Sequence, residues 1–222
     1  MEINPDSIVF WKWVYFKINA TLFYSWIVML ILILVACLAT WNLTAGYRIS
    51  RWQNILETIV SYMRTQIRET TQEKPDPFLP FLGTLFLFIS VSNFLSFVPV
   101  YHPPTGSVST TAALAICVFF AVPVYGIRQL GFTRYFQHYI KSTVFLLPFN
   151  IIGRFSRTLA LAIRLFGNIM SGTMIGAVLV SIVPLFVPIV MHALGLLIGQ
   201  IQAYIFAVLA AVYIGSAIRA VQ

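Results

Sequence analysis

Arg164 is the residue of this chain that raises a chemical question. It stands in the apolar stretch "LALAIRLFGNIMSG" at 159–172, where no other charged residue occurs. Its guanidinium stays protonated at physiological pH, and an arginine in the middle of a membrane helix costs about 2.5–3.5 kcal/mol on insertion scales. The sequence has no aspartate or glutamate after Asp76. A counter-charge for Arg164 must therefore come from the residues before 77 or from another molecule.

An arginine close to a helix end could instead snorkel to the water. Arg157 already marks the entry of this predicted helix, and Arg164 lies seven residues further on. At 1.5 Å per residue, Arg164 is about 10 Å deeper. This depth favours a functional arginine.

The residues that share the helix with Arg164 are polar or small. Asn168 and Ser171 follow at steps of four and seven, on one helical face. Gly172 and Gly176 form a G-x-x-x-G pair on nearly the same side, and such pairs let another helix approach closely. Packing alone would explain the glycines but not the arginine.

The last apolar segment carries small residues at every fourth position. They are Gly195, Gly199, Ala203, Ala207, Ala211 and Gly215. Gln202 lies beside this stripe and Tyr213 follows on the side of Gln202, whereas Gln200 points elsewhere and could satisfy a neighbour. We interpret the stripe as a groove for a neighbouring helix. His192, near the turn before this segment, is predicted to be interfacial rather than a proton relay.

No motif for covalent chemistry is present. The sequence has no phosphate-binding loop, no zinc-type spacing and no nucleophile elbow. Cys37 and Cys117 lie in apolar spans and are interpreted as small buried apolar residues. We therefore expect no catalytic residue, no metal and no cofactor.

The composition is that of a membrane protein. Of the 222 residues 59% are hydrophobic and 9% are charged, against about 25% charged in soluble domains. The net charge of +8 is assigned to topology and not to nucleic-acid binding, because no polar domain remains outside the apolar spans. We predict an all-α polytopic membrane protein.

Apolar stretches of about 20 residues predict the spans. We expect one membrane domain over residues 1–222, with an N-terminal span in 1–48, an amphipathic surface helix at 50–72, a helical hairpin at 78–128 and a long helix pair at 145–219. This gives about five membrane-embedded helices and one surface helix. The hairpin turns at "VPVYHPPTGSVST", and the long pair breaks near Pro184 and Pro188.

Basic residues predict the orientation. They gather in the connections that carry Arg48 to Lys74 and Arg128 to Arg157, and are absent from the other two turns. The positive-inside rule then places the surface helix and the C-terminus in the cytoplasm and the N-terminus outside. Lys12 and Lys17 do not fit this assignment.

With these motifs, the chain resembles subunit a of the rotary F-type ATP synthase. The matching stretches are "LALAIRLFGNIMSG" at 159–172, "IQAYIFAVLAAVYI" at 201–214 and "NFLSFVPVYHPPTGSVSTTAALAICVFF" at 93–120. The resemblance implies a non-catalytic stator subunit that couples Na⁺ or H⁺ flow to rotation and to ATP synthesis or hydrolysis. It also implies a bacterial-type plasma membrane, peripheral-stalk b subunits, and a long tilted pair of last helices against a ring of c subunits.

The resemblance also assigns roles to residues. The essential family arginine corresponds to Arg164, which meets the membrane carboxylate of each passing c subunit, and the family's asparagine and glutamine correspond to Asn168 and Gln202. Arg157 matches a basic position with lower specificity. Further candidates for lining the two half-channels are Ser171, Thr173, His192 and Tyr213.

The sequence departs from the proton-driven pattern at two positions. Thr173 and Gly195 stand where many members carry titratable residues. The absence of a proton relay there places Na⁺ slightly ahead of H⁺ and suggests the sodium-type branch of the family. Two other functions stay open: a stand-alone channel or transporter, and a structural subunit in which Arg164 binds a lipid phosphate. The absence of internal repeats argues against a transporter.

Overall fold

The computed structural model describes residues 9–12, 17–41, 51–98, 101–131, 147–182 and 187–219. Its helices are α1 (Ala20–Trp41), α2 (Arg51–Thr71), α3 (Leu79–Leu95), α4 (Val108–Leu130), α6 (Leu147–Ile182) and α7 (Val187–Arg219). A 3-10 turn, η1 (Pro104–Gly106), precedes α4, and two short antiparallel strands, β1 (Val9–Lys12) and β2 (Lys17–Asn19), precede α1. The expected break at Pro184 and the basic residues Arg48, Arg134 and Lys141 lie outside the described residues.

Four of the described helices are long and apolar enough to cross a membrane. The stretches are Ala20–Leu38, Val108–Gln129, Ile152–Ser181 and Ile189–Arg219. α3 is also apolar but has only 17 residues, and α2 is the amphipathic helix. The prediction of an all-α polytopic membrane protein with about five embedded helices and one surface helix is therefore confirmed. The small β1–β2 pair was not predicted, since main-chain pairing over so few residues leaves no hydropathy signal.

The local sequence explains where α4 starts and stops. Ser107 caps its first turn, with its Oγ accepting the Ser109 N–H at 3.2 Å. The helix ends at Gly131, whose φ of +81° suits glycine. Pro123 lies inside α4, where it removes one main-chain donor, a defect that membrane helices tolerate when neighbours compensate. These signals fix the connection at 101–107 between α3 and α4.

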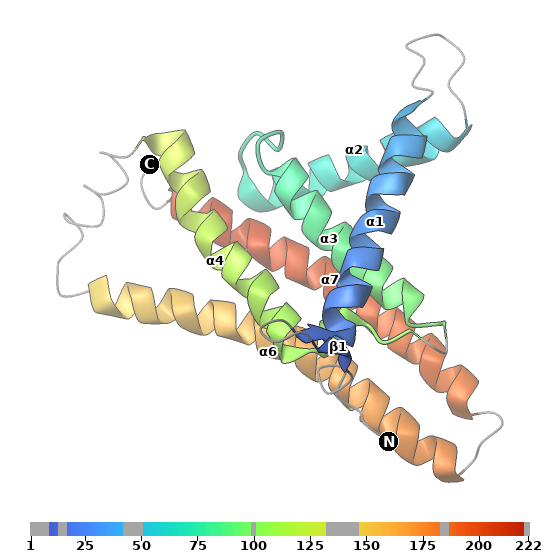
Figure 1. The fold of residues 1–222 in the computed structure, drawn as a ribbon. Helices are drawn as coiled ribbons and strands as arrows, with labels where there is room; N and C mark the ends of the chain where they lie inside the picture. Colours follow the sequence, from blue (N-terminus) through green and yellow to red (C-terminus); the bar gives the residue numbers. More distant parts are fainter. Residues whose placement is uncertain are drawn as a thin grey trace.

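α7 is the central helix of the bundle. It packs against α2, α3, α4 and α6, and Figure 1 shows it running diagonally behind α3 and α4. Half of its membrane stretch (50%) is buried within the chain, against 6% of the α6 stretch. Phe206, Ala210 and Ile214 of α7 are fully buried. α6 therefore leaves most of its surface open, while α7 is enclosed.

The small-residue stripe of α7 meets helices of the same chain. A Cβ built on Gly199 would stand 3.1 Å from Asn93 Cγ of α3, and one built on Gly215 would stand 3.0 Å from Thr71 Cα of α2. Ala203 is buried as well. At Gly199 and Gly215, the neighbouring helices that approach this stripe are therefore α3 and α2 of the same chain.

The two cysteines differ from their prediction in one respect. Cys37 and Cys117 are free, as expected, but both are exposed on the surface of the chain and not buried. They lie in α1 and α4, two of the apolar membrane helices. An exposed side chain on such a helix is open to lipid or to a neighbouring protein, and a small apolar residue suits either.

Candidate functional site

Arg164 projects from the open side of α6. Its side chain is exposed, although its helix neighbours Leu161 and Leu165, which face the bundle, have relative accessibilities of 1% and 0%. These leucines hold α6 against the bundle, and the arginine lies at the edge of the face that buries them. Among the described residues Arg164 has no hydrogen bond and no ion pair, and the last carboxylate of the sequence, Asp76, pairs with Arg64 at 3.1 Å. Within the described part of the chain, the site is thus a cation without a counter-charge on a membrane helix.

The surface of α6 beyond Arg164 contains three glycines that no described residue packs against. A Cβ built on Gly167, Gly172 or Gly176 would meet nothing within 4 Å. Ile163 and Ile175 are exposed to 60% and 51%. No part of the described chain covers this surface, so a second molecule could approach the α6 backbone closely.

The polar side chains along α6 are satisfied by their own helix. Ser171 Oγ donates to the main-chain oxygen of Asn168 at 3.1 Å, and Thr173 Oγ1 donates to that of Met170 at 2.9 Å. The hydroxyl groups of Ser and Thr in membrane helices commonly donate a hydrogen bond to a main-chain oxygen of the preceding turn. Their hydroxyl oxygens keep lone pairs free to accept a hydrogen bond or contact a cation. Asn168 itself is half-buried.

The two glutamines of α7 differ in their hydrogen bonding. Gln200 forms two hydrogen bonds with Ser90 of α3: its Oε1 accepts the hydroxyl at 2.5 Å and its Nε2 donates to the main-chain oxygen at 3.0 Å. Gln202 is buried, with 7% of its side chain accessible, and its Nε2 has no hydrogen-bond partner among the described residues. A buried donor without a partner costs about 1–3 kcal/mol. Such a cost is typical of a residue kept for function.

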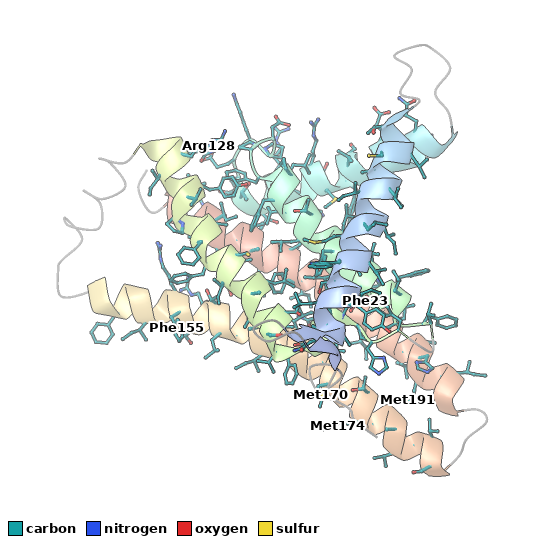
Figure 2. All side chains as sticks on the ribbon, viewed as in Figure 1. Phe23, Arg128, Phe155, Met170, Met174 and Met191 are labelled. Atoms are coloured by element: carbon teal, nitrogen blue, oxygen red, sulfur yellow. The ribbon has the colours of Figure 1, made fainter. Side chains whose placement is uncertain are left out.

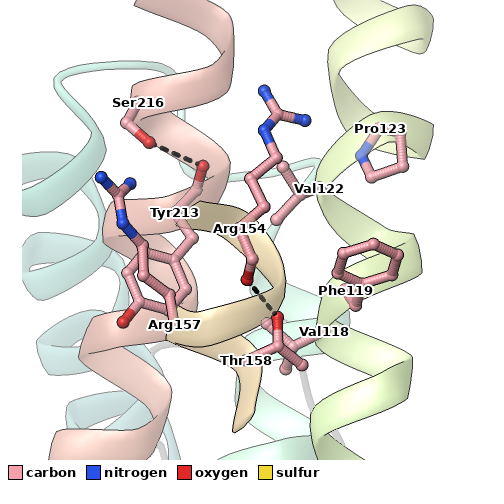
Figure 3. Close-up of a pocket in the computed structure, with 9 residues that line it drawn as sticks. All are labelled: Val118, Phe119, Val122, Pro123, Arg154, Arg157, Thr158, Tyr213 and Ser216. Atoms are coloured by element: carbon pink, nitrogen blue, oxygen red, sulfur yellow. Dashed lines mark hydrogen bonds between the residues drawn. The ribbon is translucent and has the colours of Figure 1, made fainter. Parts of the chain in front are cut away.

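Arg157 and Tyr213 meet in a cavity of about 80 Å³ between α4, α6 and α7 (Figure 3). The lining residues are Val118, Phe119, Val122, Pro123, Arg154, Arg157, Thr158, Tyr213 and Ser216. Thr158 Oγ1 and Ser216 Oγ donate to the main-chain oxygens of Arg154 and Tyr213, both at 3.0 Å. A polar cavity needs about 10–15 Å³ for each water molecule, so this one has room for several.

The remaining predicted residues lie apart from this cavity. Gln202 is eleven residues before Tyr213, which lines the cavity, and is therefore about 16 Å away along the helix. His192 and Gly195 are exposed near the start of α7. The structure therefore separates the candidates into an α6 surface with Arg164, a buried α7 position with Gln202, and a cavity with Arg157 and Tyr213.

A family model described as ATP synthase A chain matches residues 22–215. This chain belongs to the ATP synthase subunit a family. It is 58% identical to "ATP synthase subunit a 1" of Crocosphaera subtropica, over 97% of this chain and 94% of that protein. Identity is 55% with "ATP synthase subunit a 2" of Acaryochloris marina (98% and 93% covered) and 54% with "ATP synthase subunit a" of Nitrosospira multiformis (98% and 86%). The resemblance inferred from the motifs is confirmed at the level of the family; the sodium-type branch stays a prediction.

In this subunit a, sequence reasoning missed a buried polar cluster beside α7. Ser92 and Asn93 of α3 and Thr105 of η1 have accessibilities of 0%, 4% and 0%. Asn93 Nδ2 donates to the Gly199 main-chain oxygen at 2.8 Å, and Thr105 Oγ1 donates to Asn93 Oδ1 at 3.3 Å. Three polar residues within four positions of an apolar span, Ser90, Ser92 and Asn93, were the signal that could have revealed it.

A larger groove of subunit a, about 560 Å³, lies between α2, α3 and α7. Its walls are mainly apolar, and two of its polar side chains are already engaged. Tyr204 Oη donates to Gln66 Oε1 at 2.6 Å, and Ser90 is bound by Gln200. This lining favours an apolar occupant over an ion.

Proposed function

We propose that this subunit a is the stator half of a rotary ion motor, in which Arg164 is the fixed charge past which the carboxylates of a ring of c subunits move. The observation that carries the proposal is the exposed Arg164 on α6, which has no ion pair or covering segment within the described ranges, in a half of the chain that has no aspartate or glutamate. A passing carboxylate would supply the missing counter-charge. Because the attraction between unit charges is strong where water is excluded, pairing would displace the bound ion from that carboxylate.

The pairing must be transient for the ring to turn. A permanent buried ion pair would act as a structural bridge. An arginine on an open surface, held by no partner among the described residues, is able to exchange one carboxylate for the next. The same charge repels Na⁺ and H⁺, and so blocks direct passage of ions between two half-channels.

The half-channels are proposed to lie on either side of Arg164. On one side, the cavity with Arg157 and Tyr213, which has room for several water molecules, would form part of the route. On the other side, Asn168, Ser171 and Thr173 offer acceptor oxygens, with His192 at the far end and Gln202 behind α6. Since neither Thr173 nor Gly195 titrates, ions on this side would move through water and hydroxyl groups, which suits Na⁺ as well as H⁺.

The proposed orientation follows the basic ends of the helices. Figure 2 shows Arg128 on the side of the molecule opposite Met174 and Met191, which lie near the connected ends of α6 and α7. By the positive-inside rule the Arg128 end faces the cytoplasm, as does Arg219 at the end of α7. The peripheral-stalk b subunits are proposed as further partners in the bilayer.

The test is ion transport by the complete ATP synthase in sealed vesicles. We expect Arg164→Ala to abolish ATP-driven ion uptake while the complex still assembles, and Arg164→Lys to lose most of it. Arg128→Ala, at an exposed helix end, is the matched control and should transport normally. Normal uptake by Arg164→Ala would refute the proposal. Normal uptake by Arg164→Lys alone would favour a phosphate-binding role, because lysine also binds phosphate as a point charge.

A further inference from the structure

The buried polar cluster forms a chain of hydrogen bonds that ends on the backbone of α7. Its contacts run from Tyr101 Oη to Ser92 Oγ at 3.4 Å, from Ser92 Oγ to Thr105 Oγ1 at 3.4 Å, and from Thr105 Oγ1 to Asn93 Oδ1 at 3.3 Å. The last link, Asn93 Nδ2 to the Gly199 oxygen, is the shortest at 2.8 Å. The connection at 101–107 is thus linked to the central helix through one asparagine.

The direction of every bond follows from the last one. A main-chain carbonyl only accepts, so the Asn93 atom that faces Gly199 must be the amide nitrogen. The other amide atom, which faces Thr105, is then the oxygen, and Thr105 must donate to it. Each hydroxyl has one proton, so Ser92 donates to Thr105 and Tyr101 donates to Ser92. Burial raises the pKa of Tyr101 to about 12, so the phenol keeps the proton that begins the chain.

Gly199 is the position where this arrangement requires a glycine. A Cβ there would stand 3.1 Å from both Cγ and Nδ2 of Asn93, closer than ordinary van der Waals contact. In a regular helix the Gly199 carbonyl already accepts an N–H from the following turn, and its second lone pair is free for the asparagine. The missing side chain lets Asn93 reach the backbone of α7.

A second contact lies next to the first. Ser90, three residues before Asn93, holds Gln200 through two hydrogen bonds. Two adjacent residues of α7 are therefore attached to two residues on α3, and this fixes both the rotation and the depth of α7. Gln202 stands two residues after Gln200. It is buried and its Nε2 has no partner within the described part of the chain, so its direction is set by the helix that carries it.

We propose that Asn93, oriented by Thr105, is a positioning residue that sets the rotation of α7 and thereby aims the Gln202 amide at the ion path. The inference rests on the proposed function of Gln202 at that path. It gives the connection at 101–107, which is distant from Arg164 in the sequence, a part in coupling. Asn93 itself touches no ion in this scheme and acts through Gln202.

The experiment measures the ratio of ATP-driven ion uptake to ATP hydrolysis in vesicles that hold the complete complex. Thr105→Val keeps the shape of the side chain and removes the donor to Asn93, so the ratio should fall about tenfold, in the range that loss of supporting groups costs. Thr105→Ser, which keeps the hydroxyl, should restore it. Thr84→Val, on an exposed α3 threonine that bonds only Phe81 of its own helix, is the control and should match the wild type.

A double-mutant cycle separates positioning from a general structural effect. If Thr105 acts through Gln202, then Thr105→Val has no further effect in a Gln202→Ala background. An equal further loss in that background would overturn the inference, as would a Thr105→Val ratio equal to that of Thr84→Val. If the Thr105→Val complex does not assemble, Gly199→Ala is the second variant. It displaces the Asn93 amide without removing a polar group and must also lower the ratio of uptake to hydrolysis. An unchanged ratio overturns the inference. Normal transport by Arg164→Ala and Gln202→Ala would refute the proposed function, whereas loss in those variants with an inert Thr105→Val would refute this inference alone.

Discussion

Gly215 of α7 lies directly against Thr71, the last residue of α2. A Cβ on Gly215 would stand 3.0 Å from the Thr71 Cα and 3.4 Å from its main-chain oxygen. Thr71 is fully buried, and its hydroxyl donates to the Ile67 main-chain oxygen at 2.7 Å. The surface helix is therefore attached to the last membrane helix by a backbone-to-backbone contact.

Gly215→Ala is expected to destabilise the subunit by about 1–3 kcal/mol, the usual cost of an extra methyl group in a packed site. The Thr71 backbone cannot move aside as a flexible side-chain end could. Gly195→Ala adds the same methyl group to the same helix where nothing lies within 4 Å, and should be neutral or stabilising by about 1 kcal/mol. The midpoint temperature of thermal unfolding, measured on purified complexes that carry either variant, checks this prediction. Equal midpoints for the two variants would contradict it.

The neighbouring glutamines of α7 should respond oppositely to the same change. Gln200→Leu strands the Ser90 groups that it binds and should destabilise the chain by about 1–3 kcal/mol. Gln202→Leu removes a buried donor that has no partner among the described residues and should leave the chain as stable or more so, while ion uptake falls but stays measurable. Unfolding midpoints and uptake are measured on the same preparations. A destabilised Gln202→Leu would show that this amide has a structural partner.

Tyr101 should make the subunit sensitive to strong alkali. Its pKa is raised from 10.0 to about 12 by burial, so between these values the unfolded chain has released the proton and the folded chain still holds it. Its contribution to stability is complete below pH 10 and is lost as the pH rises towards 12. Tyr101→Phe should therefore flatten the fall of stability with pH over this interval. An identical slope in both proteins, from unfolding at stepped pH, would contradict the assignment.

The sequence predicted the helices well because hydropathy depends on residues close together in the chain. The segment at 145–219 appeared as a long helix pair, and α6 and α7 fill it on either side of 183–186. The face of α7 was harder, since a stripe of small residues shows that something approaches and not which helix does. The partners of Gly199 and Gly215, Asn93 and Thr71, are more than 100 residues away in the sequence.

For the candidate site, the charged residue could be found from the sequence, but the residues that position the helices around it could not. Arg164 was found because a charged residue in an apolar run is costly wherever it points, and the structure places it exposed at the edge of the face of α6 that buries Leu161 and Leu165. Asn93 was missed because its importance depends on a bond to a backbone atom of α7. Such a bond leaves no trace in the pattern of either segment, and only the packing of α3 on α7 brings it about.

The lack of carboxylates after Asp76 also bears on the life of the subunit before it works. A newly inserted chain holds Arg164 in the bilayer with nothing in its own second half to neutralise it, at a cost of about 2.5–3.5 kcal/mol on insertion scales. Binding of a carboxylate-bearing partner stabilises the inserted state by mass action. The charge that serves rotation would thus also order assembly: a subunit made in excess of its ring is the less stable species, and the one that membrane quality control would remove first.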